Sequence, residues 1–235
     1  MTEDRSRSHS ALEPVHAVLP IRTISSGKAR LGEALDAEER EELVLGMLLH
    51  TLAVLSAWPA CRRIHLVSPD PVLDVATRQS GVAVAVHRQS DEGLNAGVRL
   101  GLGAARVDAA ASVLVLPGDL PHLDVAALDE LLMAADAGVA AAAGDPLVAI
   151  APSDAGGGTN ALLLSPTDAI MPAFGPGSFE AHLRAAEAVG AAVQVVHYPT
   201  LGFDLDTPDD LERLDPARLL ELTRLGRAAM DRVVT

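Results

Sequence analysis

The feature that most constrains the fold of this chain is an alternation of short apolar runs with longer amphipathic segments. Such alternation is typical of a parallel sheet, because each connection between parallel strands passes through a crossover helix. We therefore expect a doubly wound α/β fold. The apolar runs expected as strands are His16–Pro20, Ile64–Ser68, Val82–His87, Ser112–Pro117, Leu147–Ala151, Ala161–Leu164 and Ala191–His197.

The intervening segments carry helical signals. Asp36 precedes a long amphipathic stretch, and Glu39, three residues later, completes a capping box. The apolar side of that helix is expected to be Leu43, Met47, Leu48, Thr51 and Leu55. Further helices are expected at Asp70–Ser80, Leu94–Ala105, Asp124–Ala137 and Gly177–Val189, from about Pro208, and at Arg218–Val233.

The composition supports one domain built on a closely packed core. Hydrophobic residues make up 49% of the 235 residues but aromatic ones only 2%, so Ala, Val and Leu must fill the interior. We expect a single-domain, mostly parallel twisted sheet with helices on both faces, Rossmann-like, over residues 14–235. Residues 1–13 are polar and are expected to form a disordered tail.

The net charge limits the partners. A formal charge of −14 would repel nucleic acid and anionic membranes, so neither is expected. A small anionic substrate would need a local cationic pocket or a bound metal ion. Cys61 is the sole cysteine, which excludes a disulfide framework, and neither a secretory signal nor a membrane span is evident. These features predict a cytoplasmic protein.

Lys28 is the only lysine of the chain and follows the first expected strand. Loops at the carboxyl ends of strands contact ligands in doubly wound folds. Lys28 and Arg30, beside Gly27, can neutralise a triphosphate. The alternative is a solvated surface lysine.

Asp119 lies between Gly118 and Pro121, directly after the apolar run Val113–Leu116. A carboxylate at the end of a buried strand is well placed to hold Mg²⁺ against phosphate oxygens. An ordinary turn aspartate is the alternative, because Pro-Gly-Asp also suits a turn.

Asp204 and Asp206 fall on one face of an extended segment, where two carboxylates repel each other unless a cation lies between them. Thr207 and Asp210 are expected to form a capping box for the next helix. That box explains part of the motif without chemistry, but it leaves Asp204 and Asp206 unexplained.

Together these segments resemble the nucleotidyltransferases of the molybdenum-cofactor guanylyltransferase type. The short Lys28-x-Arg30-Leu31 replaces that superfamily's glycine-rich loop, and so the chain most resembles a narrower family, the phosphoenolpyruvate or 2-phospho-L-lactate guanylyltransferases of coenzyme F420 biosynthesis. The resemblance runs from about Val15 to Leu214. It also includes Gly93-Leu94-Asn95, Gly158-Thr159-Asn160 and Phe174-Gly175-Pro176-Gly177-Ser178-Phe179.

The resemblance implies a nucleotidyltransferase that joins GMP from GTP to a small phosphorylated acid. It implies Mg²⁺ or Mn²⁺ held by Asp119, Asp204 and Asp206, with Lys28, Arg30 and Asp119 catalytic. GTP would contact Lys28, Arg30 and Asn95, although Asn95 also suits a helix start. The acid, phosphoenolpyruvate by expectation, would be bound by Thr159, Gly175 and Ser178. A plain helix cap at Ser178 is the alternative there.

Several alternatives stay open. The acceptor can instead be 2-phospho-L-lactate, 3-phospho-D-glycerate, a sugar phosphate or a molybdenum cofactor. Asp204-x-Asp206 also resembles the metal motif of glycosyltransferases, although a sugar donor needs no triphosphate loop. A nucleotide-binding regulator is the non-enzymatic alternative. The oligomeric state is open as well, with a homodimer among the options.

Overall fold

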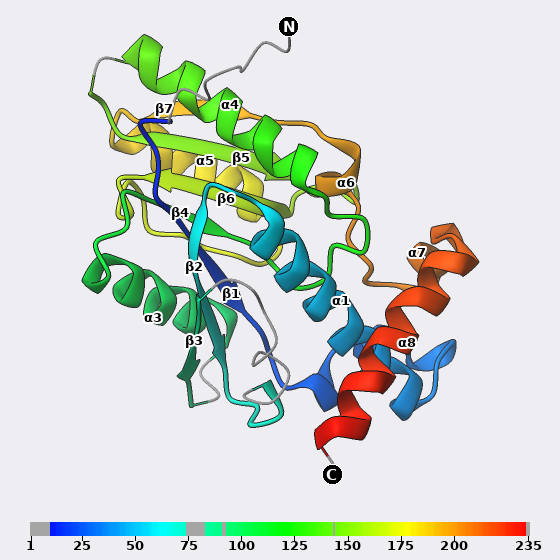
Figure 1. Cartoon of the computed structure of the whole chain (residues 1–235). Helices are drawn as coiled ribbons and strands as arrows, with labels where there is room; N and C mark the ends of the chain where they lie inside the picture. Colours follow the sequence, from blue (N-terminus) through cyan, green and yellow to red (C-terminus); the bar gives the residue numbers. More distant parts are fainter. Residues whose placement is uncertain (1–9, 74–82, 91–92, 143, 234–235) are drawn as a thin grey trace, which may run out of the picture.

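The computed structural model describes residues 10–73, 83–90, 93–142 and 144–233. Its centre is a seven-stranded sheet in the order β3-β2-β1-β4-β6-β5-β7. Within it β6 runs antiparallel to both of its neighbours, and the other strand pairs are parallel. The expected α/β class with a mostly parallel sheet is confirmed (Figure 1).

The strands lie close to the expected apolar runs, with ends that differ by a few residues. They are β1 Val15–Pro20, β2 Cys61–Ser68, β3 Ala83–Arg88, β4 Ser112–Val115, β5 Leu147–Pro152, β6 Thr159–Ser165 and β7 Ala192–Val195.

The helices also follow the expected segments. The first, α1 (Ala37–Ala57), begins with the expected capping box, in which Glu39 N donates to the Asp36 carboxylate and Asp36 N donates to Glu39. The others are α3 Leu94–Val107, α4 Val125–Ala142, α5 Ser178–Ala188, α6 Pro199–Gly202, α7 Pro208–Arg213 and α8 Pro216–Val233.

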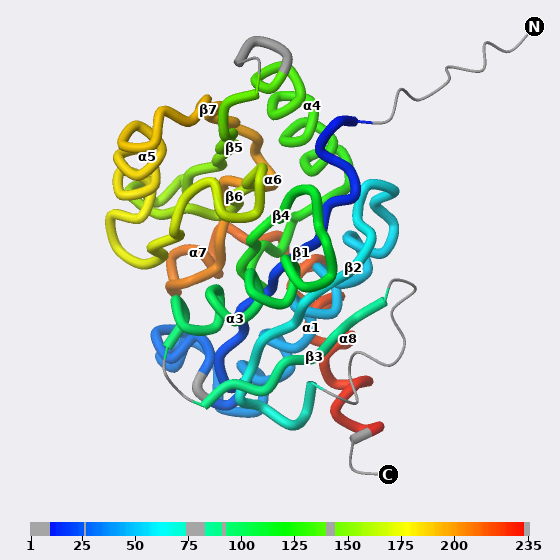
Figure 2. Tube along the Cα trace, turned by 90° about the vertical axis from the view of Figure 1, so that its left-hand side faces the viewer, coloured from blue at the N-terminus to red at the C-terminus, as the bar shows by residue number. Residues whose placement is uncertain are grey.

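The strict alternation of side chains along the central strands divides the core into two layers. Along β4 and the residue after it, Val113 and Val115 pack in the layer beneath α3 and α5, whereas Leu114 and Leu116 pack in the layer beneath α1 and α4. Viewed from the side, α3 and α5 lie on one side of the sheet and α4 and α8 on the other (Figure 2). Helices therefore cover both faces, as expected.

A third apolar cluster connects the outer helices to the segments that carry the candidate motifs. It contains Leu31 from the loop after β1 and Leu205 from between Asp204 and Asp206, together with Leu43 and Leu222 of α1 and α8. The two helices approach closely at glycines, because a Cβ on Gly226 would lie 1.8 Å from the Glu42 carbonyl oxygen. The crossing of α1 and α8 packs against Leu31 and Leu205, and so supports the segments that carry Lys28 and the pair Asp204 and Asp206.

Some expectations need correction. The disordered tail was expected to reach residue 13, but Leu12 is buried in the main core, and its carbonyl accepts a hydrogen bond from Ser112. Residues 10–13 therefore belong to the domain, while residues 1–9 lie outside the described part. Most of the expected helix Asp70–Ser80 also lies outside it. The sequence did not predict α6 or two 3-10 turns, η1 (Ile24–Ser26) and η2 (Ala29–Glu33).

Within the described ranges, every helix is too short or too polar to cross a lipid bilayer.

Candidate active site

The strand order creates a switch point between β1 and β4. From β1 the chain continues outward to β2 and β3, and it then returns to place β4 on the opposite side of β1. Ligands bind outside the carboxyl ends of the strands at such a point. A cavity of about 620 Å³ opens there, a size typical of sites for small ligands.

The cavity gathers nearly all of the residues that the sequence singled out. Lys28 and Arg30 line it from the segment after β1, and Asp119 lines it from the segment after β4. Other residues of the predicted site that line it are Thr159, Gly175, Ser178, Asp204 and Asp206.

Lys28 lies between two of the expected metal-binding carboxylates. Its Nζ is 2.5 Å from Asp119 Oδ2 and also donates to Asp206 Oδ1. The side chain is 11% exposed. Burial alone would lower the pKa of Lys28, but the Asp119 and Asp206 carboxylates outweigh burial and raise that pKa above its ordinary value. The lysine is therefore a fixed cation of the site and not a solvated surface residue.

Lys28 also adopts the left-handed backbone conformation, with φ 51° and ψ 41°. Such a conformation is uncommon for a residue with a Cβ and often occurs at functional sites. It directs the chain from η1 into η2, and Leu31 of η2 is fully buried in the third cluster. Burial of Leu31 thus holds the segment that presents Lys28 and Arg30.

Asp119 retains an oxygen that no described residue satisfies. Its Oδ2 accepts from Lys28, whereas its Oδ1 is buried without a hydrogen-bond partner in the described part of the chain. A buried carboxylate oxygen without a partner is costly unless a donor or a cation completes it. The donor set of Asp119, Asp204 and Asp206 is all-oxygen, which suits Mg²⁺ or Mn²⁺. The chemistry of these donors therefore suits the expected ion, although Lys28 already bonds to Asp119 and Asp206.

Asp204 is oriented by two donors on the same oxygen. Ser153 Oγ donates to Asp204 Oδ1 at 2.6 Å, and Asn160 Nδ2 lies 3.2 Å from that oxygen. The Asn160 amide also donates to the carbonyls of Leu201 and Gly202, which fixes the chain entering Asp204. The carboxylate is held in one orientation before any ligand arrives.

The predicted division of the Asp204–Asp210 motif is confirmed. Asp204 and Asp206 both line the cavity, while Leu205 between them is fully buried on the opposite side. Thr207 is the N-cap of α7 and forms the capping box with Asp210. Capping therefore occupies Thr207 and Asp210 and leaves the two other carboxylates facing the cavity.

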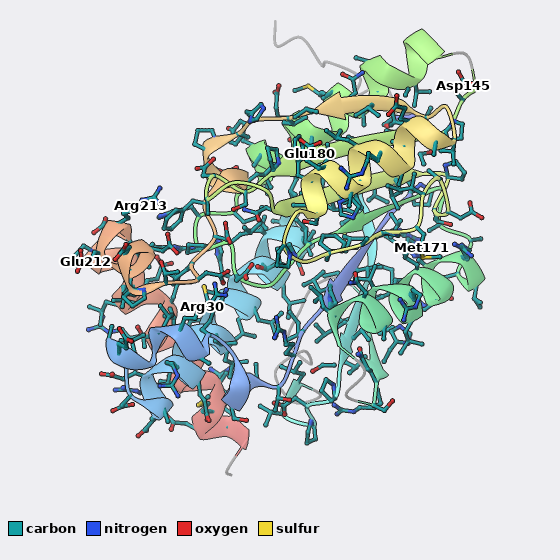
Figure 3. All side chains as sticks on the ribbon, turned by 180° about the vertical axis from the view of Figure 1, so that it is seen from behind. Arg30, Asp145, Met171, Glu180, Glu212 and Arg213 are labelled. Carbon is teal, nitrogen blue, oxygen red and sulfur yellow. The ribbon has the colours of Figure 1, made fainter. Side chains whose placement is uncertain are left out.

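Arginines extend the positive charge toward the mouth of the cavity. Arg30 is exposed and lies on η2, below α7 and its Arg213 as seen in Figure 3. Arg22, two residues after β1, also lines the cavity and is exposed. We did not single out Arg22 from the sequence, although its position beside the end of a central strand was a signal. These arginines offset the −14 charge locally.

The residues expected to bind the acid line the same cavity. Thr159 begins β6 and is 6% exposed, and Ser178 begins α5 and is 2% exposed. The N-cap of α5 is Gly177, so Ser178 does not cap the helix, and the structural alternative for this residue is wrong. Gly175 has φ 132°, a conformation that glycine adopts without strain.

Part of the expected anion-binding helix start is already occupied. Ser178 N donates to the Gly175 carbonyl, and Phe179 N donates to the Gly157 carbonyl. These two N–H groups are therefore not available to donate hydrogen bonds to the acid substrate. Binding must therefore rest on hydroxyls and on the remaining backbone groups of the loop.

Asn95 does not line the cavity. Its side chain makes two hydrogen bonds with the backbone of Phe174. Nδ2 donates to the carbonyl at 2.9 Å, and Oδ1 accepts from the amide at 2.8 Å. Both polar ends are thus used within the protein, so the arrangement does not support the expected contact with GTP. Asn95 instead fixes the loop that carries Gly175.

His182 was not singled out from the sequence and is fully buried beside Thr159. Its Nδ1 lies 3.0 Å from Thr159 Oγ1, and its Nε2 accepts from Ala173 N at 2.9 Å. Burial lowers the pKa of His182 to about 4. Ser153 and Asn160 were likewise missed as orienting groups, because their partners are distant in the chain.

Comparison with known proteins identifies the family to which the chain is related. The family model for guanylyl transferases of the CofC type matches residues 15–215. Phosphoenolpyruvate guanylyltransferase of Rubrobacter xylanophilus is 41% identical over 201 residues, covering 86% of this chain and 93% of the relative. The enzyme of that name from Sphaerobacter thermophilus is 40% identical over 199 residues, covering 84% and 91%.

Solved structures show the same fold at low sequence identity. A nucleotide-diphospho-sugar transferase from Desulfovibrio desulfuricans superposes with a TM-score of 0.68 at 15% identity, covering 94% of this chain and 98% of that one. A nucleotidyl transferase from Methanothermobacter superposes with a TM-score of 0.60 at 19% identity, covering 88% and 98%. From the family match and the identities above, the chain belongs to the CofC-like guanylyl transferase family.

Proposed function

We propose that this protein transfers GMP from GTP to the phosphate of phosphoenolpyruvate, as a step of coenzyme F420 biosynthesis. The observation that carries the proposal is a single cavity that is lined both by Lys28 and the three carboxylates and by Thr159, Gly175 and Ser178. Family membership gives the reaction type, and relatives named phosphoenolpyruvate guanylyltransferase support the choice of acid.

The reaction is a substitution at the α-phosphorus of GTP. A phosphate oxygen of the acid forms the new P–O bond, while the bond from the α-phosphorus to the oxygen bridging to the β-phosphate breaks. Pyrophosphate leaves with that electron pair, and the product is enolpyruvoyl-2-diphospho-5'-guanosine. A phosphate dianion is nucleophilic at neutral pH, so no general base is needed. Catalysis rests on positioning and on compensation of charge.

Lys28 and Arg30 supply positive charge for the departing β- and γ-phosphates. The position of Lys28 in the lining of the cavity, with its side chain only 11% exposed, supports this role. Its contacts with Asp119 and Asp206 hold that charge at the carboxyl ends of β1 and β4. Arg30 is exposed, so its guanidinium stays hydrated until the phosphates bind and can then contact them.

Asp119, Asp204 and Asp206 are the residues that would hold Mg²⁺ or Mn²⁺. When bound, such an ion neutralises phosphate charge and aligns the reacting groups. The unsatisfied Oδ1 of Asp119 supports this assignment, as does the fixed orientation of Asp204.

The acid would be held by uncharged donors. Two anions must come together in an acidic protein, and hydroxyl groups bind an anion without adding a second cation that would compete for the GTP phosphates. Ser178 supports this arrangement, since its hydroxyl makes no hydrogen bond to another described residue and does not cap α5.

The test of the proposal is a comparison of acids. Purified protein is incubated with GTP, Mg²⁺ and either phosphoenolpyruvate, 2-phospho-L-lactate or 3-phospho-D-glycerate, and pyrophosphate release is followed together with the mass of the product. We expect the highest kcat/KM with phosphoenolpyruvate. Turnover with another acid alone would overturn the choice of substrate, and absence of acid-dependent pyrophosphate release would overturn the transferase proposal.

Ser178→Ala separates the acceptor site from the GTP site. Loss of one hydrogen bond to a charged group costs about 1.5–3 kcal/mol, which corresponds to a rise of about 10- to 100-fold in the KM for the acid. The KM for GTP should stay within about twofold. The control is Ser56→Ala, because Ser56 donates to a carbonyl within α1 and does not line the cavity. An equal loss of GTP affinity in Ser178→Ala would contradict the assignment of the two subsites.

A further inference from the structure

The hydrogen bonds of His182 define the protonation of its ring. The backbone amide of Ala173 can only donate, so Nε2 of His182 must accept with its lone pair. The ring is neutral near pH 7 because burial holds its pKa at about 4. A neutral ring with an unprotonated Nε2 carries its proton on Nδ1.

The protonated Nδ1 determines what the Thr159 hydroxyl can do. Nδ1 lies 3.0 Å from Thr159 Oγ1 and must donate to it. The hydroxyl oxygen therefore acts as an acceptor toward His182, and its own hydrogen is free to point elsewhere. Thr159 lines the cavity, where an anionic ligand supplies acceptors only. The hydroxyl is thus preset as a donor before the ligand binds.

The same ring holds the facing loop. Nε2 of the ring accepts from Ala173 N. The ring of the next residue, Phe174, packs edge-on against His182 with centroids 5.0 Å apart. Asn95 of α3 makes two hydrogen bonds with the backbone of Phe174. The two walls of the acceptor pocket, at Thr159 and at Gly175, are therefore joined through one imidazole.

We infer that His182 is a positioning residue of the acceptor site, which orients the Thr159 hydroxyl toward the acid and holds the Ala173–Gly175 segment in place. The inference rests on the proposed function, because it takes the acid to bind beside Thr159. His182 is fully buried and does not line the cavity, so it acts only through Thr159 and the loop.

Two substitutions separate the two nitrogens of the ring. Asparagine places an amide near the position of Nδ1, so His182→Asn keeps a donor for Thr159 but loses the bond to Ala173. Glutamine reaches the position of Nε2, so His182→Gln keeps an acceptor for Ala173 but loses the donor to Thr159. Thr159→Val removes the hydroxyl itself. The control is His197→Gln, since His197 is exposed and does not line the cavity.

The measurements are the KM values for phosphoenolpyruvate and GTP, with thermal melting to confirm folding. We expect Thr159→Val and His182→Gln to raise the KM for phosphoenolpyruvate by a similar factor, about 10- to 100-fold, with the KM for GTP unchanged. His182→Asn should recover part of that loss. The double variant Thr159→Val/His182→Gln should be no worse than Thr159→Val alone, because both changes remove one interaction.

The outcomes distinguish the two proposals. If Thr159→Val raises the KM for phosphoenolpyruvate but His182→Gln does not, or if the double variant loses the full product of both effects, the inference is overturned and the proposed function stands. If His182→Asn and His182→Gln only lower the melting temperature and change both KM values equally, His182 is merely structural. If Thr159→Val leaves the KM for the acid unchanged, the proposed acceptor site is itself wrong and the inference falls with it.

Discussion

Replacement of Asp119 by Asn tests the centre of the site, because the two carboxylate oxygens have different surroundings. Oδ2 accepts from Lys28 Nζ, and Oδ1 is buried without a partner among the described residues. In Asp119→Asn the amide oxygen must face the lysine, because an NH₂ group there would meet another donor. The NH₂ group then occupies the Oδ1 position, where we expect the metal ion. The substitution therefore removes a charge and also places two hydrogens where a cation should bind.

The magnitude follows from these two losses. Weakening of the charge-assisted bond to Lys28 costs about 1.5 kcal/mol or more, and loss of metal-based charge compensation commonly costs several kcal/mol. A combined loss of about 4 kcal/mol corresponds to about a thousandfold lower kcat/KM. Stability should change little, since Lys28 keeps its bond to Asp206 and the Asp119 side chain is 24% exposed. A shift of at most about 4 °C in Tm is expected.

The assay is pyrophosphate release with GTP varied and Mg²⁺ titrated, together with calorimetric binding of Mn²⁺. Asp209→Asn is the matched control, because Asp209 lies exposed in the first turn of α7 and does not line the cavity. The reasoning fails if folded Asp119→Asn retains the Mn²⁺ affinity and the kcat/KM of the parent. A thousandfold loss accompanied by unfolding would equally contradict the expected separation of activity from stability.

Three further predictions concern the phosphate loop, the helix crossing and a buried histidine. Lys28→Ala should lower kcat/KM for GTP about a hundredfold or more, and Lys28→Arg should restore it only in part because a guanidinium differs in shape and reach; steady-state kinetics with parent-like values for both would refute the role. Gly226→Ala should destabilise the fold by about 2–3 kcal/mol, since the new Cβ would lie 1.8 Å from the Glu42 carbonyl oxygen, whereas Gly103→Ala in α3, with nothing within 4 Å, should stabilise it by about 0.5–1 kcal/mol; urea unfolding of both variants checks the two signs. His182 has a pKa lowered to about 4 in the folded chain against about 6.5 when unfolded, so its contribution of about 3 kcal/mol is complete above pH 6.5 and is lost as the pH falls toward 4. Urea unfolding from pH 7 to pH 4 should show a smaller loss in His182→Asn than in the parent, and equal losses would refute the assignment.

The sequence by itself determined the parts of the fold that depend on local periodicity. The apolar runs marked the strands, because side chains alternate across a sheet whatever their partners are. The capping boxes at Asp36 and Thr207 were recognisable because both members lie three residues apart. The common face of Asp204 and Asp206, which both line the cavity, also followed from alternation, with Leu205 between them buried.

Pairings between distant segments were decided only by the tertiary structure. Lys28 contacts Asp119, which is 91 residues away in the sequence, and Asp206, which is 178 residues away. Both contacts depend on the order of the strands in the sheet. Because β6 runs antiparallel to β4 and β5, its first residue, Thr159, lies at the end of the sheet where those two strands have their carboxyl ends. No local pattern encodes that placement.

Asn95 and His182 show why assignment from residue type fails in such cases. An asparagine two residues after a glycine has the chemistry to bind a nucleotide, yet the packing of α3 against the Phe174 loop engages both ends of its amide. A histidine within an amphipathic helix carried no signal, yet burial and two hydrogen bonds give its ring a defined proton position. Residue type limits what a side chain can donate or accept, but its partners are set by long-range packing, because hydrogen bonds form only between groups that the whole fold brings within about 3 Å of each other.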